Sequence, residues 1–236
     1  MMDDTTEPTV ITLRPELARS RAGLDRDERI VKDGILRMGS LVESQIRDAI
    51  RSVVERNPGL AQLVITEDAR VNEAQRVIAD TVVMAIATQS PVARDLRFLM
   101  ALDHVAFELE RIGDHASGIA KQTRHLASEP PIREIRDLAT MGNVAADLVR
   151  GVVTALIDID DKVAREVAAR DDEIDHSYHK VFAEVIDLMR TDPRTVERGT
   201  RVILAAHWVE RIGDRVTNIA EDVVYLATGQ VEDLNP

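Results

Sequence analysis

The sequence contains no cysteine, which excludes disulfide bonds, zinc–thiolate sites and iron–sulfur clusters. Aromatic residues are also scarce, with one Trp, two Tyr and three Phe in 236 residues. Hydrophobic residues nevertheless make up 44% of the chain. The core must therefore consist mainly of Leu, Ile, Val and Ala, a mixture that suits packed helices.

An excess of positive charge is missing as well, because the net charge of the chain is −12. Nucleic acid needs a cationic protein surface, so this charge argues against nucleic acid as a partner, and it also disfavours adsorption to anionic lipid. No stretch approaches about 18 consecutive apolar residues, and the first 15 residues lack the apolar segment of a signal peptide. We therefore expect a cytoplasmic protein that does not span a membrane.

Apolar side chains recur at spacings of three and four along most of the chain, which is the pattern of amphipathic helices. Turn-forming sequences interrupt the pattern at Asn57-Pro58-Gly59, Pro130-Pro131 and Thr191-Asp192-Pro193, and Ser90-Pro91 is expected to cap and open a helix. The interruptions divide the chain into six predicted helical runs, which cover about residues 24–56, 60–89, 91–126, 132–158, 161–190 and 194–228.

The third and sixth runs are copies of each other. Sliding the sequence by one hundred residues places Glu110–Asp114 on Glu210–Asp214, and both segments read Glu-Arg-Ile-Gly-Asp. The apolar positions on either side keep the same phase, so we predict an all-α fold of two tandem three-helix bundles with long antiparallel helices. The predicted divisions are an N-terminal arm of residues 1–23, a first repeat of residues 24–129, a second repeat of residues 130–229 and a tail of residues 230–236.

The repeated segment is unfavourable for an isolated helix. Glu110 and Asp114 lie one above the other on one helix face, and two like charges at this spacing cost roughly 0.2–0.5 kcal/mol. The glycine between them costs about 0.5–1 kcal/mol more than alanine. The same features recur at Glu210 and Asp214. This repetition predicts a carboxylate pair with room above it for a cation or for a closely approaching helix.

Each repeat offers a second acidic pair on its middle helix. In the second repeat the pair is Asp171 and Asp175, whereas the equivalent positions of the first repeat are Asp68 and Asn72. If the middle and last helices lie side by side, we expect four oxygen-bearing side chains to converge in each repeat. Carboxylate oxygens suit hard or borderline ions, so the candidates are iron, zinc, manganese, magnesium and calcium.

Other interpretations of these acids remain open. Glu and Asp four residues apart also occur on solvated helix faces, and Arg111 and Arg211 are placed to neutralise them without an ion. A metal-dependent enzyme and a metal-free helical scaffold are the two alternative functions. A phosphate-binding Walker loop, a glycine-rich dinucleotide turn and a nucleophile elbow are all absent from the sequence, so we predict that the protein is not an enzyme.

The same residues resemble the PhoU family of phosphate-transport regulators. The two Glu-Arg-Ile-Gly-Asp segments carry most of the resemblance. Further matches are Met38-Gly39 with Val42 and Glu43, Asp68 with Val71-Asn72, the helix opening Pro91 to Asp95-Leu96-Arg97, and Asp192-Pro193-Arg194-Thr195. The resemblance covers about residues 25–229 and leaves out the N-terminal arm.

The resemblance implies a fold of paired three-helix bundles, a homodimer, and carboxylate sites that hold metal ions such as iron or zinc. It also implies repression of phosphate uptake and of the phosphate-starvation response. The expected partners are the ATPase subunit of the phosphate ABC transporter and a sensor histidine kinase, so the protein would meet the membrane only through them. The implied metal ligands are Glu110, Asp114, Glu210, Asp214, Asp68, Asp171 and Asp175. Asn72 departs from a fully acidic pattern, which puts the ion content of the first repeat in doubt.

Overall fold

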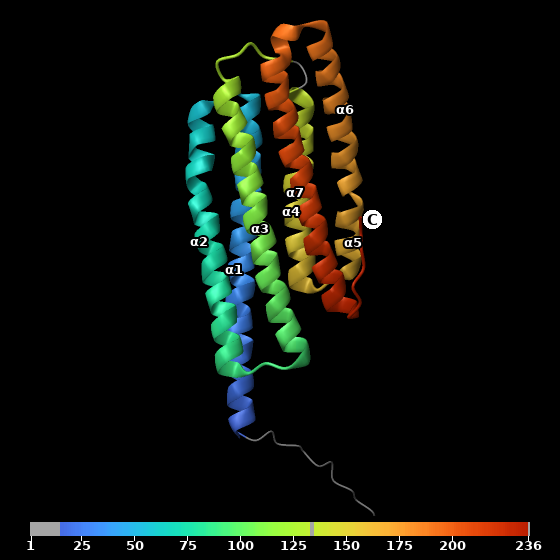
Figure 1. The fold of residues 1–236 in the computed structure, drawn as a ribbon. Helices are drawn as coiled ribbons and strands as arrows, with labels where there is room; N and C mark the ends of the chain where they lie inside the picture. The colour runs from blue at the N-terminus through green and yellow to red at the C-terminus, as the bar shows by residue number, and fades with distance from the viewer. Residues whose placement is uncertain (1–14, 133–134, 236) are drawn as a thin grey trace, which may run out of the picture.

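The computed structural model describes residues 15–132 and 135–235, and within these ranges all regular structure is helical (Figure 1). A short 3₁₀ turn, Pro193–Thr195, precedes the last helix. The α-helices are α1 (Pro15–Val54), α2 (Pro58–Gln89), α3 (Ala93–Leu126), α4 (Ile135–Asp158), α5 (Asp161–Ala169), α6 (Asp171–Thr191) and α7 (Val196–Thr228).

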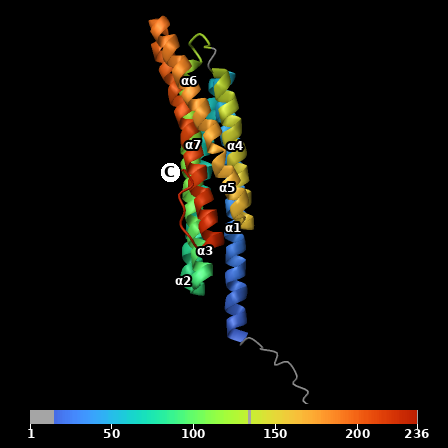
Figure 2. The ribbon, with the colours of Figure 1, turned by 90° about the vertical axis from the view of Figure 1, so that its right-hand side faces the viewer.

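The helices form two bundles that stand side by side. The first contains α1, α2 and α3, and the second contains α4, α7 and the pair α5 and α6 (Figure 1). Between the bundles, α3 packs along α7 and α1 packs along α4, and Figure 2 shows α1 and α4 together on one edge. The predicted all-α fold of two three-helix bundles is therefore confirmed, with one hydrophobic core continuous through both.

Most helix ends follow the predicted turn chemistry. The Asn57 side chain accepts a hydrogen bond from the backbone N–H of Leu60 at 3.0 Å and so caps α2, with Pro58 at the first helical position. Gly229 ends α7 with φ of +76°, a conformation that favours glycine. The prediction for Ser90-Pro91 was wrong. Ser90 instead ends α2 in a left-handed conformation, and α3 begins at Ala93.

Two helix boundaries also differ from the sequence prediction. Helix α1 begins at Pro15, so residues 15–23 of the predicted arm are helical, while residues 1–14 lie outside the described part. The predicted run 161–190 is broken at Arg170, where ψ is −4°. The Arg170 N–H bonds to the carbonyl of Val167, a 3₁₀-type contact that ends α5. Asp171 consequently becomes the first residue of a new helix.

Helix α4 is the most apolar helix that the structure describes. Its residues 137–158 are long and apolar enough to cross a membrane by length and composition alone, a property that was not predicted from the sequence. Of its most apolar window, 56% is buried in the protein, because α4 lies against both α1 and α7. Its apolar character is thus accounted for by packing between the bundles.

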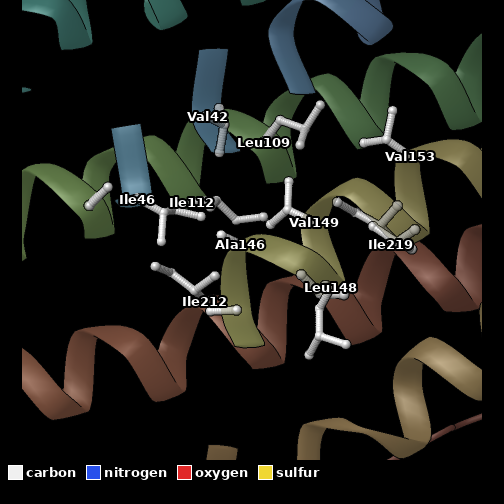
Figure 3. Packing of buried hydrophobic residues seen from close by; sticks show 14 of the residues in the cluster. Val42, Ile46, Leu109, Ile112, Ala146, Leu148, Val149, Val153, Ile212 and Ile219 are labelled. Atoms are coloured by element: carbon white, nitrogen blue, oxygen red, sulfur yellow. The ribbon is translucent and has the colours of Figure 1, made fainter. Parts of the chain in front are cut away.

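The contact between the bundles is made by the apolar sides of the repeated segments. Ile112 of α3 and Ile212 of α7 are completely buried, and Figure 3 shows them with Ala146 and Val149 of α4 in the shared core. Further along the same contact, Trp208 of α7 stacks on His115 of α3 at 5.1 Å between ring centroids. Burying the central isoleucine of each segment turns its flanking acids away from the shared core.

Gly142 allows α4 to approach α1 closely, because a Cβ at this position would overlap the buried side chain of Ile50. We expect Gly142→Ala to lower the free energy of unfolding by about 1–3 kcal/mol, even though alanine favours a helix. Urea unfolding monitored by circular dichroism measures the change. Thr140→Ala, at an exposed position of the same helix, is the control. Unchanged stability of Gly142→Ala would mean that Ile50 moves aside without cost.

Candidate functional site

The first carboxylate cluster contains Asp68 of α2 with Glu110 and Asp114 of α3. Burial raises the pKa of Asp68 and of Glu110, and the charge of Asp114 raises both further. Gln45 of α1 donates a hydrogen bond from Nε2 to Asp68 Oδ1 at 2.9 Å. The three acids are thus brought together as predicted, although one of them is already held by a neutral amide.

The second carboxylate cluster contains Asp171 and Asp175 of α6 with Glu210 and Asp214 of α7. Asp171 is only 4% exposed, and burial together with the charges of Asp175, Asp214 and Glu210 raises its pKa to about 7. Burial and the charge of Asp214 also raise the pKa of Asp175 and of Glu210. Four carboxyl groups therefore share one small region, and burial favours the protonated form of Asp171.

The glycine of each repeated segment, Gly113 or Gly213, admits a side chain from a neighbouring helix. A Cβ on Gly213 would overlap Oδ1 of Asp171 and would lie 3.0 Å from its Cγ. A Cβ on Gly113 would lie 3.1 Å from Gln45 Oε1 and 3.5 Å from Asp68 Oδ1. In both repeats the space above the glycine is filled by a polar side chain. The cost of glycine in the helix is explained by this close approach.

Arginine neutralises the outer acids only in part. Arg111 lies 3.3 Å from Asp114, and Arg211 lies 3.4 Å from Asp214, on side chains that are about two-fifths exposed. For Asp114 and Asp214, the solvated-face interpretation therefore has direct support. The inner acids differ, since Asp171 Oδ1 is buried and has no hydrogen-bond donor among the described residues.

The remaining contacts of the second cluster are few. Asp171 Oδ2 accepts hydrogen bonds from Thr217 Oγ1 at 3.5 Å and from Asn235 Nδ2 at 3.3 Å. His207 Nδ1 lies 3.1 Å from Glu210 Oε2. Asn235 and Gln45 were not predicted from the sequence, since both reach the acids from outside the repeated motif. His207 could have been found from its spacing of three residues from Glu210.

The residue types in these clusters suit a metal ion, but their side chains are not arranged to bind one in this structure. In this side-chain arrangement, no three carboxylate or imidazole groups of the described residues converge closely enough to hold an ion. The second cluster nevertheless offers four oxygen donors, a buried oxygen without a donor and mutual repulsion that a cation would relieve. Closing around an ion requires rotation of outer side chains such as Asp214, which is 42% exposed.

The first repeat fits a cation less well. Asn72 stands where the second repeat has Asp175, and its buried Oδ1 finds no hydrogen-bond donor in the described part of the chain. The first cluster therefore has three carboxyl groups where the second has four, and it offers a cation less negative charge. The two repeats therefore offer unequal sites, and the second is the stronger candidate.

Comparison with known proteins gives consistent matches over both repeats. The PhoU domain model matches residues 35–123 and 138–223. The chain is 35% identical over 202 residues to a phosphate-specific transport system accessory protein PhoU homolog of Clostridium acetobutylicum, covering 85% of this chain and 92% of that protein. A homolog of the same name from Rhizobium meliloti is 33% identical, with 90% of each chain covered.

Solved structures agree with the sequence matches. The crystal structure of PhoU from Pseudomonas aeruginosa superposes with a TM-score of 0.84 at 33% identity, covering 87% of this chain and 99% of that chain. The phosphate transport system regulatory protein PhoU from Streptococcus pneumoniae gives a TM-score of 0.83 at 28% identity, with 89% and 99% covered. The arrangement of helices around both carboxylate clusters is thus shared with these proteins.

The raised pKa of Asp171 predicts a pH-dependent stability. The folded protein holds the proton more tightly than the unfolded chain, so this contribution to stability is full below about pH 4 and is lost as the pH rises to about 7. In the presence of a chelator, we expect Asp171→Asn to be more stable than wild type at pH 8, by on the order of 2–4 kcal/mol. The difference should shrink towards pH 4.

Urea unfolding between pH 4 and pH 8 measures this difference. Asp187→Asn removes an exposed acid from the same helix and serves as the control, because it should shift stability by similar small amounts at all pH values. A stability difference for Asp171→Asn that does not vary with pH would contradict the assigned burial of the Asp171 charge.

Proposed function

The chain belongs to the PhoU family, and we propose that it represses phosphate uptake and the phosphate-starvation response as a metal-binding adaptor. The observation that carries the proposal is the match of both repeats to accessory and regulatory proteins of phosphate transport, over most of each chain. In this proposal the protein works in the cytoplasm and catalyses no reaction of its own. It links the ATPase subunit of a phosphate ABC transporter to a sensor histidine kinase, and it acts as a homodimer.

Exposed apolar side chains support the adaptor role, because helical faces that bind partners need them. In the first bundle, α2 exposes Val77, Val83 and Met84, and α3 exposes Met100 and Phe107. These side chains are between 41% and 62% exposed. Such a surface gives a partner an apolar contact area on a protein whose overall charge is strongly negative.

The carboxylate clusters support the metal-binding part of the proposal. Asp171, Asp175, Glu210 and Asp214 would hold an ion in the second repeat, and Asp68, Glu110 and Asp114 would do so more weakly in the first. A bound divalent or trivalent ion supplies positive charge that cancels the repulsion among these acids. Because the acids come from two helices in each repeat, an ion bound to them would hold the middle helix against the last one and stabilise the bundle.

The regulatory role is tested in cells grown with ample phosphate. Deleting the gene should raise a reporter of the phosphate-starvation response and the rate of phosphate uptake several-fold, and wild-type protein should restore both. A pull-down from the complemented cells should recover the transporter ATPase and the kinase. If the reporter and uptake stay unchanged and neither partner is recovered, the regulatory proposal is wrong.

The metal-binding role is tested by elemental analysis of untagged protein after reconstitution with iron, zinc, manganese or magnesium. Wild type should retain about one ion or more per chain, and the Asp171→Asn, Asp175→Asn, Glu210→Gln, Asp214→Asn variant should lose most of it. The control converts two exposed acids of the same helices, Asp187→Asn and Glu197→Gln. Equal metal content in all three proteins would mean that the metal binds outside the second cluster, and no metal in wild type would favour a metal-free scaffold.

A further inference from the structure

The tail after α7 folds back onto the second bundle. Gly229 turns the chain at the end of α7, and residues 230–235 then run along α5 (Figure 1). The equivalent chain after α3 leads through Pro130-Pro131 towards α4 instead. The returning tail is therefore a feature of the second repeat alone.

Two contacts anchor the tail. Arg165 of α5 forms a bidentate ion pair with Glu232, with Nη1 at 2.6 Å from Oε2 and Nη2 at 2.9 Å from Oε1. Two parallel hydrogen bonds of this kind fix both distance and orientation. The backbone N–H of Leu234 donates to Glu221 Oε1 of α7 at 3.0 Å, and its side chain packs against the core. The tail is thus tied to helices on both sides of it.

The end of the tail reaches the most buried acid of the second cluster. Asn235 Nδ2 donates to Asp171 Oδ2 at 3.3 Å, beside the longer contact from Thr217. The other oxygen, Oδ1, lies over Gly213 and has no donor among the described residues. The amide therefore holds one oxygen of the carboxyl group, while the other is buried against Gly213 without a donor.

The tail also borders an open cavity beside the cluster. A cavity of about 450 Å³ separates it from α7. One wall comes from the α7 side chains Asp214, Thr217, Asn218 and Glu221, and the other comes from Val231, Glu232, Asp233 and Asn235. Since Asp214 belongs to the second cluster, the cavity borders the acids and the tail forms its outer wall.

We propose that residues 231–235 are a strap that positions the Asp171 carboxyl group and closes the second carboxylate cluster around a divalent cation. This role of the strap rests on the proposed metal binding. Asn235 is a positioning residue, because it acts on the cation through Asp171. If the closed strap raises the affinity for the cation by some factor, the bound cation must favour strap closure by the same factor, since coupling between two equilibria is reciprocal.

The test measures Mn²⁺ affinity by the loss of the free-ion signal in electron paramagnetic resonance. All proteins carry Glu110→Gln and Asp114→Asn, so that only the second cluster binds. Three changes release the strap in different ways: Asn235→Ala removes the amide donor, Glu232→Ala removes the ion pair, and a chain ended after Gln230 lacks the strap. Gln230→Ala is the control, because this exposed side chain precedes the strap and does not line the cavity.

We expect the shortened chain to bind Mn²⁺ about tenfold more weakly and to release it to a chelator correspondingly faster, as is usual when a group orienting a ligand is removed. Asn235→Ala and Glu232→Ala should each weaken binding about three- to tenfold, and the control Gln230→Ala should leave it unchanged. Asn235→Gln, which keeps the amide donor, should bind more tightly than Asn235→Ala. Circular dichroism checks that each variant stays folded.

A second measurement reports on the strap itself. Hydrogen exchange of the Leu234 amide, which donates to Glu221, should slow when Mn²⁺ binds, and Asp171→Asn should abolish that slowing. A tail that merely packs on the surface would exchange at the same rate with and without the ion.

The two proposals fail in different ways. Tight Mn²⁺ binding with equal affinity in all strap variants and unchanged Leu234 exchange would overturn the strap and leave the metal site standing. Absence of Mn²⁺ binding in the parent protein with an intact second cluster would overturn both the site and the strap.

Discussion

The structure depends on the packing of α3 against α7. These two helices carry the same repeated segment, and each buries the central isoleucine of that segment, Ile112 or Ile212, in one shared core. Because neighbouring positions on a helix point in defined directions, burying the isoleucine leaves the flanking acids facing the middle helix of their own bundle. One apolar contact between repeats thus sets the orientation of both carboxylate clusters.

The two repeats differ in the groups that surround their carboxylate clusters. In both repeats an amide donates to the inner aspartate, Gln45 to Asp68 and Asn235 to Asp171, but in the first repeat Asn72 removes one charge. In the second, the helix break at Arg170 places Asp171 over Gly213, where its buried charge is opposed by three other acids. The electrostatic repulsion among the carboxyl groups is therefore stronger in the second repeat.

Hydrogen bonds and an ion pair also join the two bundles. Glu108 of α3 is only 3% exposed and accepts hydrogen bonds from Arg215 and Asn218 of α7. On the opposite edge, Arg47 of α1 pairs with Asp147 of α4 at 2.7 Å. Removing one partner of a buried ionic contact is costly, so the bundles resist separation. The two bundles are thus joined by polar contacts at both edges of their shared core.

The sequence by itself determined the helices, the duplication and the pairing of acids with glycine, because helical period and residue spacing are local properties. The spacing of the acids within each repeat was also enough to group Asp68 with Glu110 and Asp171 with Glu210. Only the tertiary structure decided which acids are buried, where the second middle helix breaks, and that Gln45 and Asn235 reach the clusters. Burial and long-range hydrogen bonds depend on which residues far apart in the sequence come into contact in the fold. Local sequence patterns do not specify those contacts.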